Sequence, residues 1–153
     1  MSTGEWTEHE EPDIAARHLL LCREVVWNSS DGEAPYNLRG LLTSIAVRGD
    51  FPLVYHRPIH TFVQFFGSLG EYEVWIEVVR LVQDDEGEFV DETEAVVFGP
   101  FEIAITKIAF LHGRSFPLKK VPFDAPGYFE FRVRVAGVYD VIIAERLFVE
   151  GEL

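Results

Sequence analysis

The sequence predicts an all-β protein, an antiparallel sandwich of about seven to nine strands. In the segment 127–135, one face carries only apolar side chains: Phe129, Phe131, Val133 and Val135. Charged side chains alternate with them, which is typical of a strand with one buried face. Further apolar runs recur along the chain, separated by turn-forming residues, and no long helical pattern interrupts them. A small closed β-barrel is the alternative, because strand number alone does not separate the two folds.

Eight segments have the composition expected of strands. They are 16–27, 38–48, 59–67, 71–82, 94–105, 106–118, 127–135 and 141–149. The first ends in Val25-Val26-Trp27, which favours a strand over a helix. Gly40 predicts a bulge in the second segment, and a shift in alternation at Val78-Val79 predicts another in the fourth. Ala136-Gly137 predicts the turn between the last two strands.

The formal net charge of −13 is concentrated in two acidic segments. Residues 1–13 contain five acids and residues 84–94 contain seven, and neither segment contains Lys or Arg. The rest of the chain is close to neutral, with fourteen acids against thirteen bases. We therefore expect residues 1–13 to form a disordered acidic tail and residues 14–153 a single β-sandwich domain. Residues 84–94 are expected to form a mobile loop that contributes little to stability.

Composition also narrows the partners and the location. A strongly acidic chain is expected to repel polyanions, so we predict no nucleic acid and no membrane as a partner. No apolar run approaches the ~18 residues of a transmembrane helix, and residues 1–13 lack the features of a secretory signal. The single cysteine, Cys22, lies in an apolar run, where we expect a buried, inert thiol. A lone cysteine without a secretory signal predicts a reducing, cytoplasmic location.

The chain resembles a small bacterial family of unknown function whose members have an immunoglobulin-like β-sandwich. The residues that carry the resemblance in the C-terminal part are Pro126, Gly127, Tyr128, Gly137 and Glu145. The upstream run LLLCREVVWN and the break at Phe51-Pro52 are similar to the first strands of that family, so the resemblance covers about residues 16–149. It implies an immunoglobulin-like fold and no activity. Gly127 and Tyr128 are adjacent here, whereas many sandwich domains separate such a pair by one residue, which argues against a tyrosine-corner hydrogen bond.

The sequence contains no nucleophile, phosphate-binding or zinc motif, so we predict no catalytic residue, no metal and no cofactor. His56 and His60 flank Pro58 and lack a third ligand, which favours ordinary loop and strand histidines over a metal pair. The acidic segment 84–94 offers oxygen ligands for calcium, but its spacing does not match an EF-hand loop, and we favour a solvated loop.

The candidate binding residues are aromatic side chains with polar neighbours. In the segment 71–82, alternation directs Tyr72, Val74 and Ile76 to the core and leaves Trp75 among glutamates on the other face. Exposed tryptophans are frequent anchors of binding surfaces. The predicted binding residues are Trp75, Phe66, Glu73 and Glu77.

These features predict a non-enzymatic domain that acts by protein interaction or self-assembly, with a protein or a second copy of the chain as its partner. The alternative is a carbohydrate or other small-ligand module that uses Trp75 and the nearby glutamates, since acids beside an aromatic side chain are common in sugar chemistry. A hydrolase of an unrecognised type is the least favoured function.

Overall fold

Strands make up the regular structure in the computed structural model, which describes residues 11–27 and 36–152. Their bounds are β1 (Ile14–Trp27), β2 (Tyr36–Leu41), β3 (Ser44–Arg48), β4 (Leu53–Val54), β5 (Ile59–Gly67), β6 (Gly70–Gln83), β7 (Phe89–Asp91), β8 (Val96–Ile105), β9 (His112–Leu118), β10 (Pro122–Phe123), β11 (Gly127–Val135) and β12 (Ile143–Glu152). None of the described residues is helical, and so none lies in a helix that could cross a membrane.

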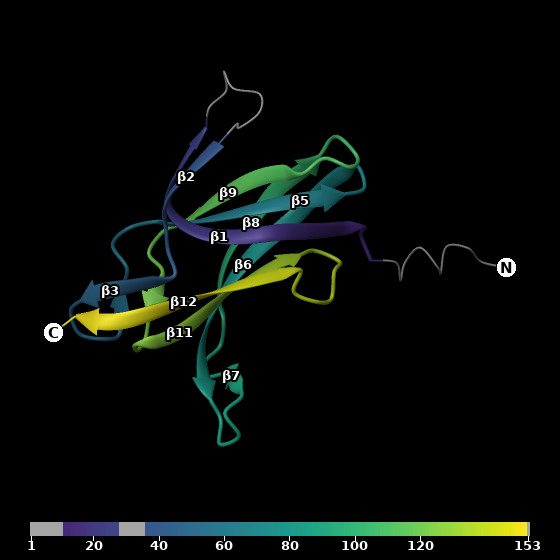
Figure 1. Cartoon of the computed structure of the whole chain (residues 1–153). Coiled ribbons are helices and arrows are strands. Elements are labelled where there is room, and N and C mark those ends of the chain that lie inside the picture. Colours follow the sequence, from purple (N-terminus) through teal and green to yellow (C-terminus); the bar gives the residue numbers. More distant parts are fainter. Residues whose placement is uncertain (1–10, 28–35, 153) are drawn as a thin grey trace.

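Two main sheets form the two layers of the domain (Figure 1). The four-stranded sheet has the order β2-β1-β5-β9, and the six-stranded sheet has the order β3-β12-β11-β6, with β7 and β8 both paired to β6. Strands β4 and β10 form a small third sheet. The pairs are antiparallel except for β3 and β12, which run parallel. The sheets do not close on themselves, so the predicted open sandwich is confirmed and the barrel alternative is wrong.

The core lies between the two sheets, and alternation along each strand fills it. The predicted inward row of β11 is buried as expected: Phe129, Phe131, Val133 and Val135. Aromatic rings meet across the layers, such as Phe65 with Phe116 at 6.2 Å and Phe123 with Phe129 at 4.8 Å between ring centroids. Cys22 is buried too, as predicted, and burial raises the pKa of its thiol.

The predicted outward row of β11 is not fully exposed. Glu130, Arg132 and Arg134 are half-buried, because ion pairs with neighbouring strands cover them. Alternation correctly gives the side of the sheet on which these residues lie. Alternation does not indicate which side chains cover that side of the sheet, so it does not predict the partial burial of these three residues.

Two predicted strands and one predicted bulge differ from the structure. The segment 38–48 is not one strand but breaks after Leu41, so that β2 joins the four-stranded sheet and β3 joins the six-stranded sheet. The predicted bulge at Val78-Val79 is absent, and both side chains are buried. The irregularity in β6 lies instead between Val74 and Ile76, where the pairing with β8 shifts. The segment 106–118 is a strand only from His112 onward.

The acidic segment 84–94, predicted as a loop, contains a strand. It forms a hairpin in which β7 pairs with the end of β6, and the Asp84 carboxylate accepts backbone hydrogen bonds from Glu86 and Glu88, each 2.9 Å long. This carboxylate therefore stabilises a turn. The ring of Phe89 also packs against Tyr128, with ring centroids 5.5 Å apart.

The predicted acidic tail, 1–13, is described only from residue 11 onward; residues 1–10 lie outside the described part of the chain. The backbone N–H of Ser68 donates to Asp13 O at 2.8 Å, and Tyr139 N donates to a Glu11 carboxylate oxygen at 2.9 Å. Residues 11–13 thus contact two loops of the sandwich.

Candidate functional site

The four predicted binding residues do not form one site. Trp75, Glu73 and Glu77 lie on β6 in the six-stranded sheet, whereas Phe66 lies on β5 in the four-stranded sheet. Trp75 is half-buried, and its ring is close enough to Gly99 that a β-carbon there would come within 3.2 Å of it. The side chain of Phe66 is exposed on the surface of the four-stranded sheet.

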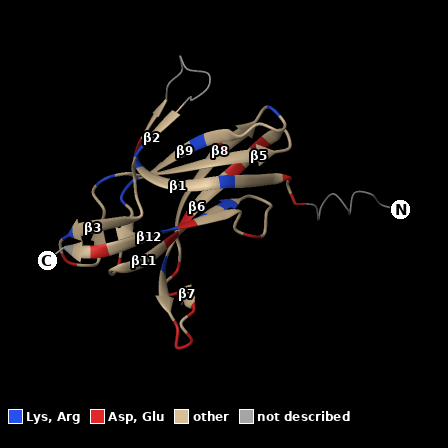
Figure 2. Ribbon diagram, viewed as in Figure 1, with Lys and Arg blue, Asp and Glu red and all other residues tan. Residues whose placement is uncertain are grey.

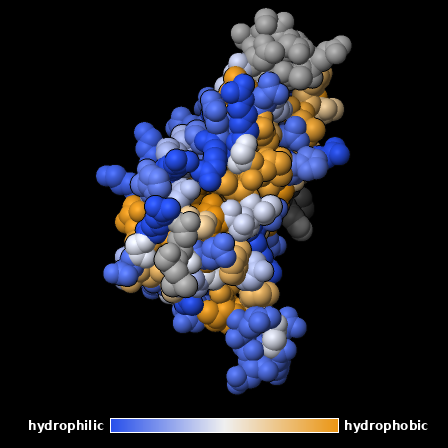
Figure 3. All heavy atoms as spheres, turned by 60° about the vertical axis from the view of Figure 1, so that its left-hand side comes forward, coloured by the Kyte–Doolittle hydropathy of each residue, from blue (hydrophilic) through white to orange (hydrophobic). Residues whose placement is uncertain are grey.

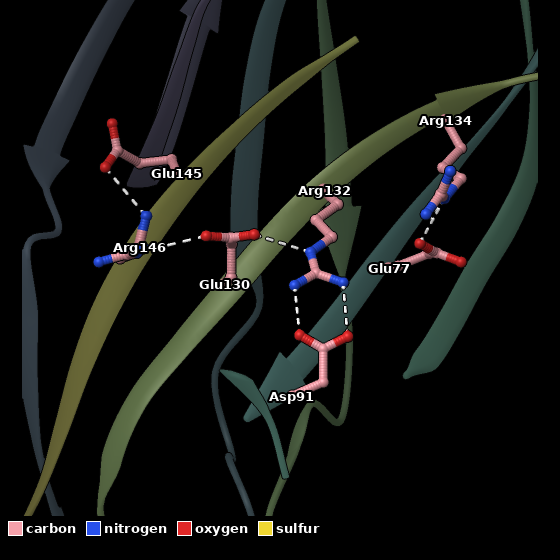
Figure 4. Close-up of polar contacts among 7 residues, drawn as sticks. All are labelled: Glu77, Asp91, Glu130, Arg132, Arg134, Glu145 and Arg146. Atoms are coloured by element: carbon pink, nitrogen blue, oxygen red, sulfur yellow. Dashed lines mark hydrogen bonds and ion pairs between the residues drawn. The ribbon is translucent and has the colours of Figure 1, made fainter. Parts of the chain in front are cut away.

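The outer face of the six-stranded sheet carries a series of ion pairs (Figure 4). Arg132 donates two hydrogen bonds to Asp91, at 2.7 and 3.0 Å, and a third to Glu130 at 2.7 Å. Arg134 donates to Glu77 at 2.6 Å, and Arg146 reaches the second oxygen of Glu130 at 3.3 Å. Hydrogen bonding to Arg132 lowers the pKa of Asp91, and the same bonds raise the pKa of Arg132.

These contacts involve one of the acids considered for sugar binding. Glu77, one of the two predicted acids, is already paired with Arg134. The guanidinium groups of β11 and β12 pair with Asp91, Glu130 and Glu77 on this face. These ion pairs join β7, β11 and β12 to one another.

A cavity lies elsewhere, at the end of the sandwich that carries β3 and β4. It has a volume of about 500 Å³ and is lined by Arg23 of β1, by Ala46–Arg48 of β3, and by Leu53–Arg57. We call this cavity the arginine pocket. Its cationic side chains are Arg23, Arg48 and Arg57, and His56 lies beside them.

Arg23 reaches the pocket because of its place in β1. Leu19 and Leu21 point into the core, and Arg23 continues the same row past the end of the apolar core. Its aliphatic stem lies across Gly40 of the neighbouring strand, where a β-carbon would come within 3.0 Å of it. Gly40 has a φ of +66°, which glycine adopts without strain. Gly40, which was predicted to mark a bulge, therefore makes room for the side chain of Arg23.

The other two arginines stand on separate segments. Arg48 is the last residue of β3. Arg57 follows Tyr55, which anchors its segment because the backbone N–H of Tyr55 donates to Val121 O at 2.9 Å. The Tyr55 ring is buried and packs on Phe123, with centroids 6.1 Å apart. One wall of the pocket is therefore anchored by Tyr55, and its arginines are exposed.

The lining of the arginine pocket contains no acid. Neither Arg23 nor Arg57 forms an ion pair with another described residue. Lys119 and Lys120 are exposed, and they precede Val121, whose carbonyl accepts the hydrogen bond from Tyr55 N in the pocket wall. Figure 3 turns this end forward and shows strongly hydrophilic side chains gathered on it, with apolar surface between them. Arginines such as Arg23 and Arg57 at the wall of a cavity attract an anionic group.

A second, smaller cavity provides a contrast. It has a volume of about 200 Å³, and Arg80 in its wall is accompanied by Glu94 and Asp124. Glu92 also approaches Arg80 at 3.8 Å. The acids around this cavity balance its single cation, so it has no comparable attraction for an anion.

The pocket could not be predicted from the sequence, because its residues are far apart along the chain. One signal was available: between residues 36 and 69 there are three arginines, Arg39, Arg48 and Arg57, against the single acid Asp50. His56 and His60, considered above as a metal pair, separate in the structure: His56 lines the pocket and His60 lies in β5. Within the described residues, no three His, Cys, Asp or Glu side chains gather to hold a metal ion.

No protein-family model matches the sequence, and no curated protein matches it either. Among solved structures, the chain is similar to that of a Pseudomonas fluorescens alkylpurine DNA glycosylase, AlkC, bound to DNA that contains an abasic site analogue. The TM-score is 0.49 and the sequence identity 11%, over 91% of this chain and 31% of the other. The chain therefore spans about a third of that protein's length.

This comparison corrects one prediction. The exclusion of nucleic acid as a partner rested on the net charge alone, and the similar structure is that of a DNA-bound protein. We therefore withdraw the exclusion. The likeness is too distant to assign DNA binding to this chain. The physical reason for the correction is that net charge describes the whole chain, whereas a ligand meets the local charge of a site.

Proposed function

We propose that this protein is a non-enzymatic binding domain whose ligand presents an anionic group, a phosphate or a carboxylate, to the arginine pocket. The observation that supports the proposal most directly is the cavity of about 500 Å³ whose lining holds three arginines, a histidine and no acid. Arginine is suited to such groups because its planar guanidinium donates two parallel hydrogen bonds to them.

The composition of the lining favours binding over catalysis. The lining residues include no Asp, Glu, Ser, Thr or Cys, so they supply cations and apolar contacts but neither a carboxylate base nor a thiol. Leu53 and Val54 offer apolar contact beside the charged groups. The lining is mainly polar, and polar groups that converge on a cavity are typical of a ligand site. A cytoplasmic location belongs to the same proposal, because the unpaired thiol of Cys22 suits a reducing compartment.

A second exposed surface lies at the opposite end of the sandwich. The loop before β9 exposes Ile108, Phe110 and Leu111, and Leu69 is exposed in the hairpin between β5 and β6. Exposed apolar groups of this kind are typical of contact surfaces. They do not specify the chemistry of a partner, whereas the arginine pocket does, and the proposal therefore rests on the pocket.

The test is a titration of the ¹⁵N-labelled protein with tripolyphosphate and, separately, with citrate at low ionic strength. We expect the backbone resonances that shift to be those of residues 46–48, 53–57 and Arg23. The charge reversals Arg23→Glu and Arg57→Glu should each weaken binding at least tenfold. Lys107→Glu is the matched control, because Lys107 lies in the loop at the opposite end and its reversal changes the net charge equally.

Two results would contradict the proposal. One is a set of shifts that is spread over the surface or centred away from the pocket. The other is an equal loss of binding in the Lys107→Glu control, because only the overall charge would then matter. Raising the salt concentration should weaken binding in the unmodified protein, since the arginines are at the rim of the pocket.

A further inference from the structure

The arginine pocket borders an unpaired strand edge. In the six-stranded sheet, β3 is the terminal strand, and β12 is its only strand partner among the described residues. Residues 46–48 of β3 also line the pocket. A ligand held in the pocket therefore lies beside a strand whose outer edge pairs with no other strand among the described residues.

The pairing with β12 shows which backbone groups of β3 face outward. In a parallel pair, alternate residues of a strand direct both their N–H and their C=O to the partner. The bond from Phe148 N to Thr43 O, 3.0 Å long, together with the register Phe148↔Ser44, fixes the phase. Ile45 and Val47 bond to β12, and the backbone groups of Ser44 and Ala46 are directed to the unpaired edge.

From this juxtaposition we propose that the ligand of the arginine pocket is an acidic peptide segment of a partner protein, which binds in extended conformation as an added strand on β3. The proposal rests on the anion-binding function above and names its ligand. Added strands gain their affinity from backbone hydrogen bonds and their specificity from alternate side chains. Side chains on one face of such a strand repeat about every 6.8 Å, so successive carboxylates meet different cations of the pocket.

The lining favours a peptide over a single-stranded nucleic acid. Proteins that bind single strands place exposed aromatic rings where bases can stack. The only aromatic ring in the lining besides His56 is that of Tyr55, which is 6% exposed and packs on Phe123. The pocket thus combines positive charge with a strand edge and lacks a stacking platform. Hydrogen bonds along a strand edge match a peptide backbone.

The probe is a fluorescent, end-capped seven-residue peptide of alternating Glu and Val, with the alternating Gln and Val peptide as its uncharged control. Two further probes carry N-methyl groups on alternate amides, one in each phase, because only half of the amides of an added strand face β3. By fluorescence anisotropy we expect the Gln peptide to bind at least tenfold more weakly. One N-methylated phase should lose tenfold or more, while the other binds nearly as well as the parent.

Ala46→Pro tests the same edge from the protein side. Proline removes the N–H that faces away from β12, and proline is tolerated on an edge strand where that N–H faces solvent. We expect this variant to lose at least tenfold in peptide affinity and to keep its affinity for citrate. If the variant does not fold, the N-methylated peptides still decide the question in the unmodified protein.

Four outcomes separate the two proposals. Phase-specific loss with the N-methylated peptides, together with loss in Arg57→Glu, supports strand addition. If binding depends on Arg57 but is unchanged by N-methylation and by Ala46→Pro, strand addition is wrong and the anion-binding proposal is retained. Failure of the peptide while a single-stranded oligonucleotide binds in the pocket overturns the ligand class. Failure of peptide, oligonucleotide, citrate and tripolyphosphate overturns both proposals.

Discussion

The ion pair between Arg132 and Asp91 joins the acidic hairpin to the sandwich, and its strength can be derived from its geometry. The Arg132 side chain is 16% exposed and that of Asp91 is 50% exposed, so the pair lies between an exposed pair and a buried one. Exposed pairs contribute roughly 0.2–1 kcal/mol, whereas breaking a buried pair costs about 3–5 kcal/mol. Two short hydrogen bonds place this pair near the upper end of the exposed range.

We therefore expect a coupling energy of about 1 kcal/mol between the two side chains. Removal of Asp91 does not leave Arg132 without a partner, because Glu130 still accepts a hydrogen bond from it at 2.7 Å. This retained contact is the reason that the cost stays well below that of a buried pair. The half-exposed carboxylate also allows salt to screen the interaction.

The assay is a double-mutant cycle by urea denaturation. The variants are Arg132→Met, which keeps most of the apolar stem, Asp91→Asn, and the two combined. Glu88→Gln is the control, because it removes the same charge from the hairpin without an ion pair to another described residue. We expect the coupling to fall by half or more in ~1 M salt. A coupling above about 3 kcal/mol, or one near zero at low salt, would refute this account.

Phe131→Ala should lower the free energy of unfolding by about 3–5 kcal/mol, because Phe131 is 0% exposed. Phe66→Ala should lower it by less than about 1 kcal/mol, because Phe66 is exposed. Chemical denaturation measures both values, and similar losses in the two variants would contradict the assigned faces. Cys22 should react with Ellman's reagent only on unfolding, since it is buried and its pKa is raised, so rapid reaction of the folded protein would count against this. The pKa of Asp91 is lowered in the folded state. The stability that this carboxylate contributes is therefore complete at a pH above the ordinary pKa of aspartate, and it is lost as the pH falls through the lowered pKa. The difference in stability between the unmodified protein and Asp91→Asn should therefore shrink below about pH 4, and a difference independent of pH would show that the charge is irrelevant. Trp75→Ala should destabilise the fold by about 1–2 kcal/mol because the ring is half-buried, and a loss below about 0.5 kcal/mol would restore it as a free contact residue.

Local patterns in the sequence predict the strands well where one face of the strand meets the core. The row from Phe129 to Val135 is the clearest case, since alternation and burial agree at every position. The same rule does not predict exposure on the other face. Arg132 is half-buried because Asp91, forty-one positions away, comes back across the sheet to meet it. The alternation of apolar and polar residues along one strand does not indicate a contact between residues so far apart in the sequence.

The segment 38–48 shows a second limit. Its apolar residues favour an extended chain throughout, and both β2 and β3 are extended. The change of sheet near Leu42 depends on tertiary pairing, because Leu42 N donates to Leu21 O while Thr43 O accepts from Phe148 N. Neither contact has a local signature. Because this change of sheet brings β3 beside Arg23, the candidate site could not be predicted either.

Net charge was the least reliable guide to function, for a physical reason. Exposed charges are screened over about 8 Å at physiological salt, so a ligand responds to the groups around its site. The acidic hairpin projects from the sandwich away from the end that carries β3 (Figure 2), and residues 11–13 contact the loops at the far end. The described acids of these two segments thus stand apart from Arg23 and Arg57, whereas Glu150 and Glu152 of β12 lie beside β3. A site for an anion is consistent with an acidic protein when much of its negative charge lies away from the site.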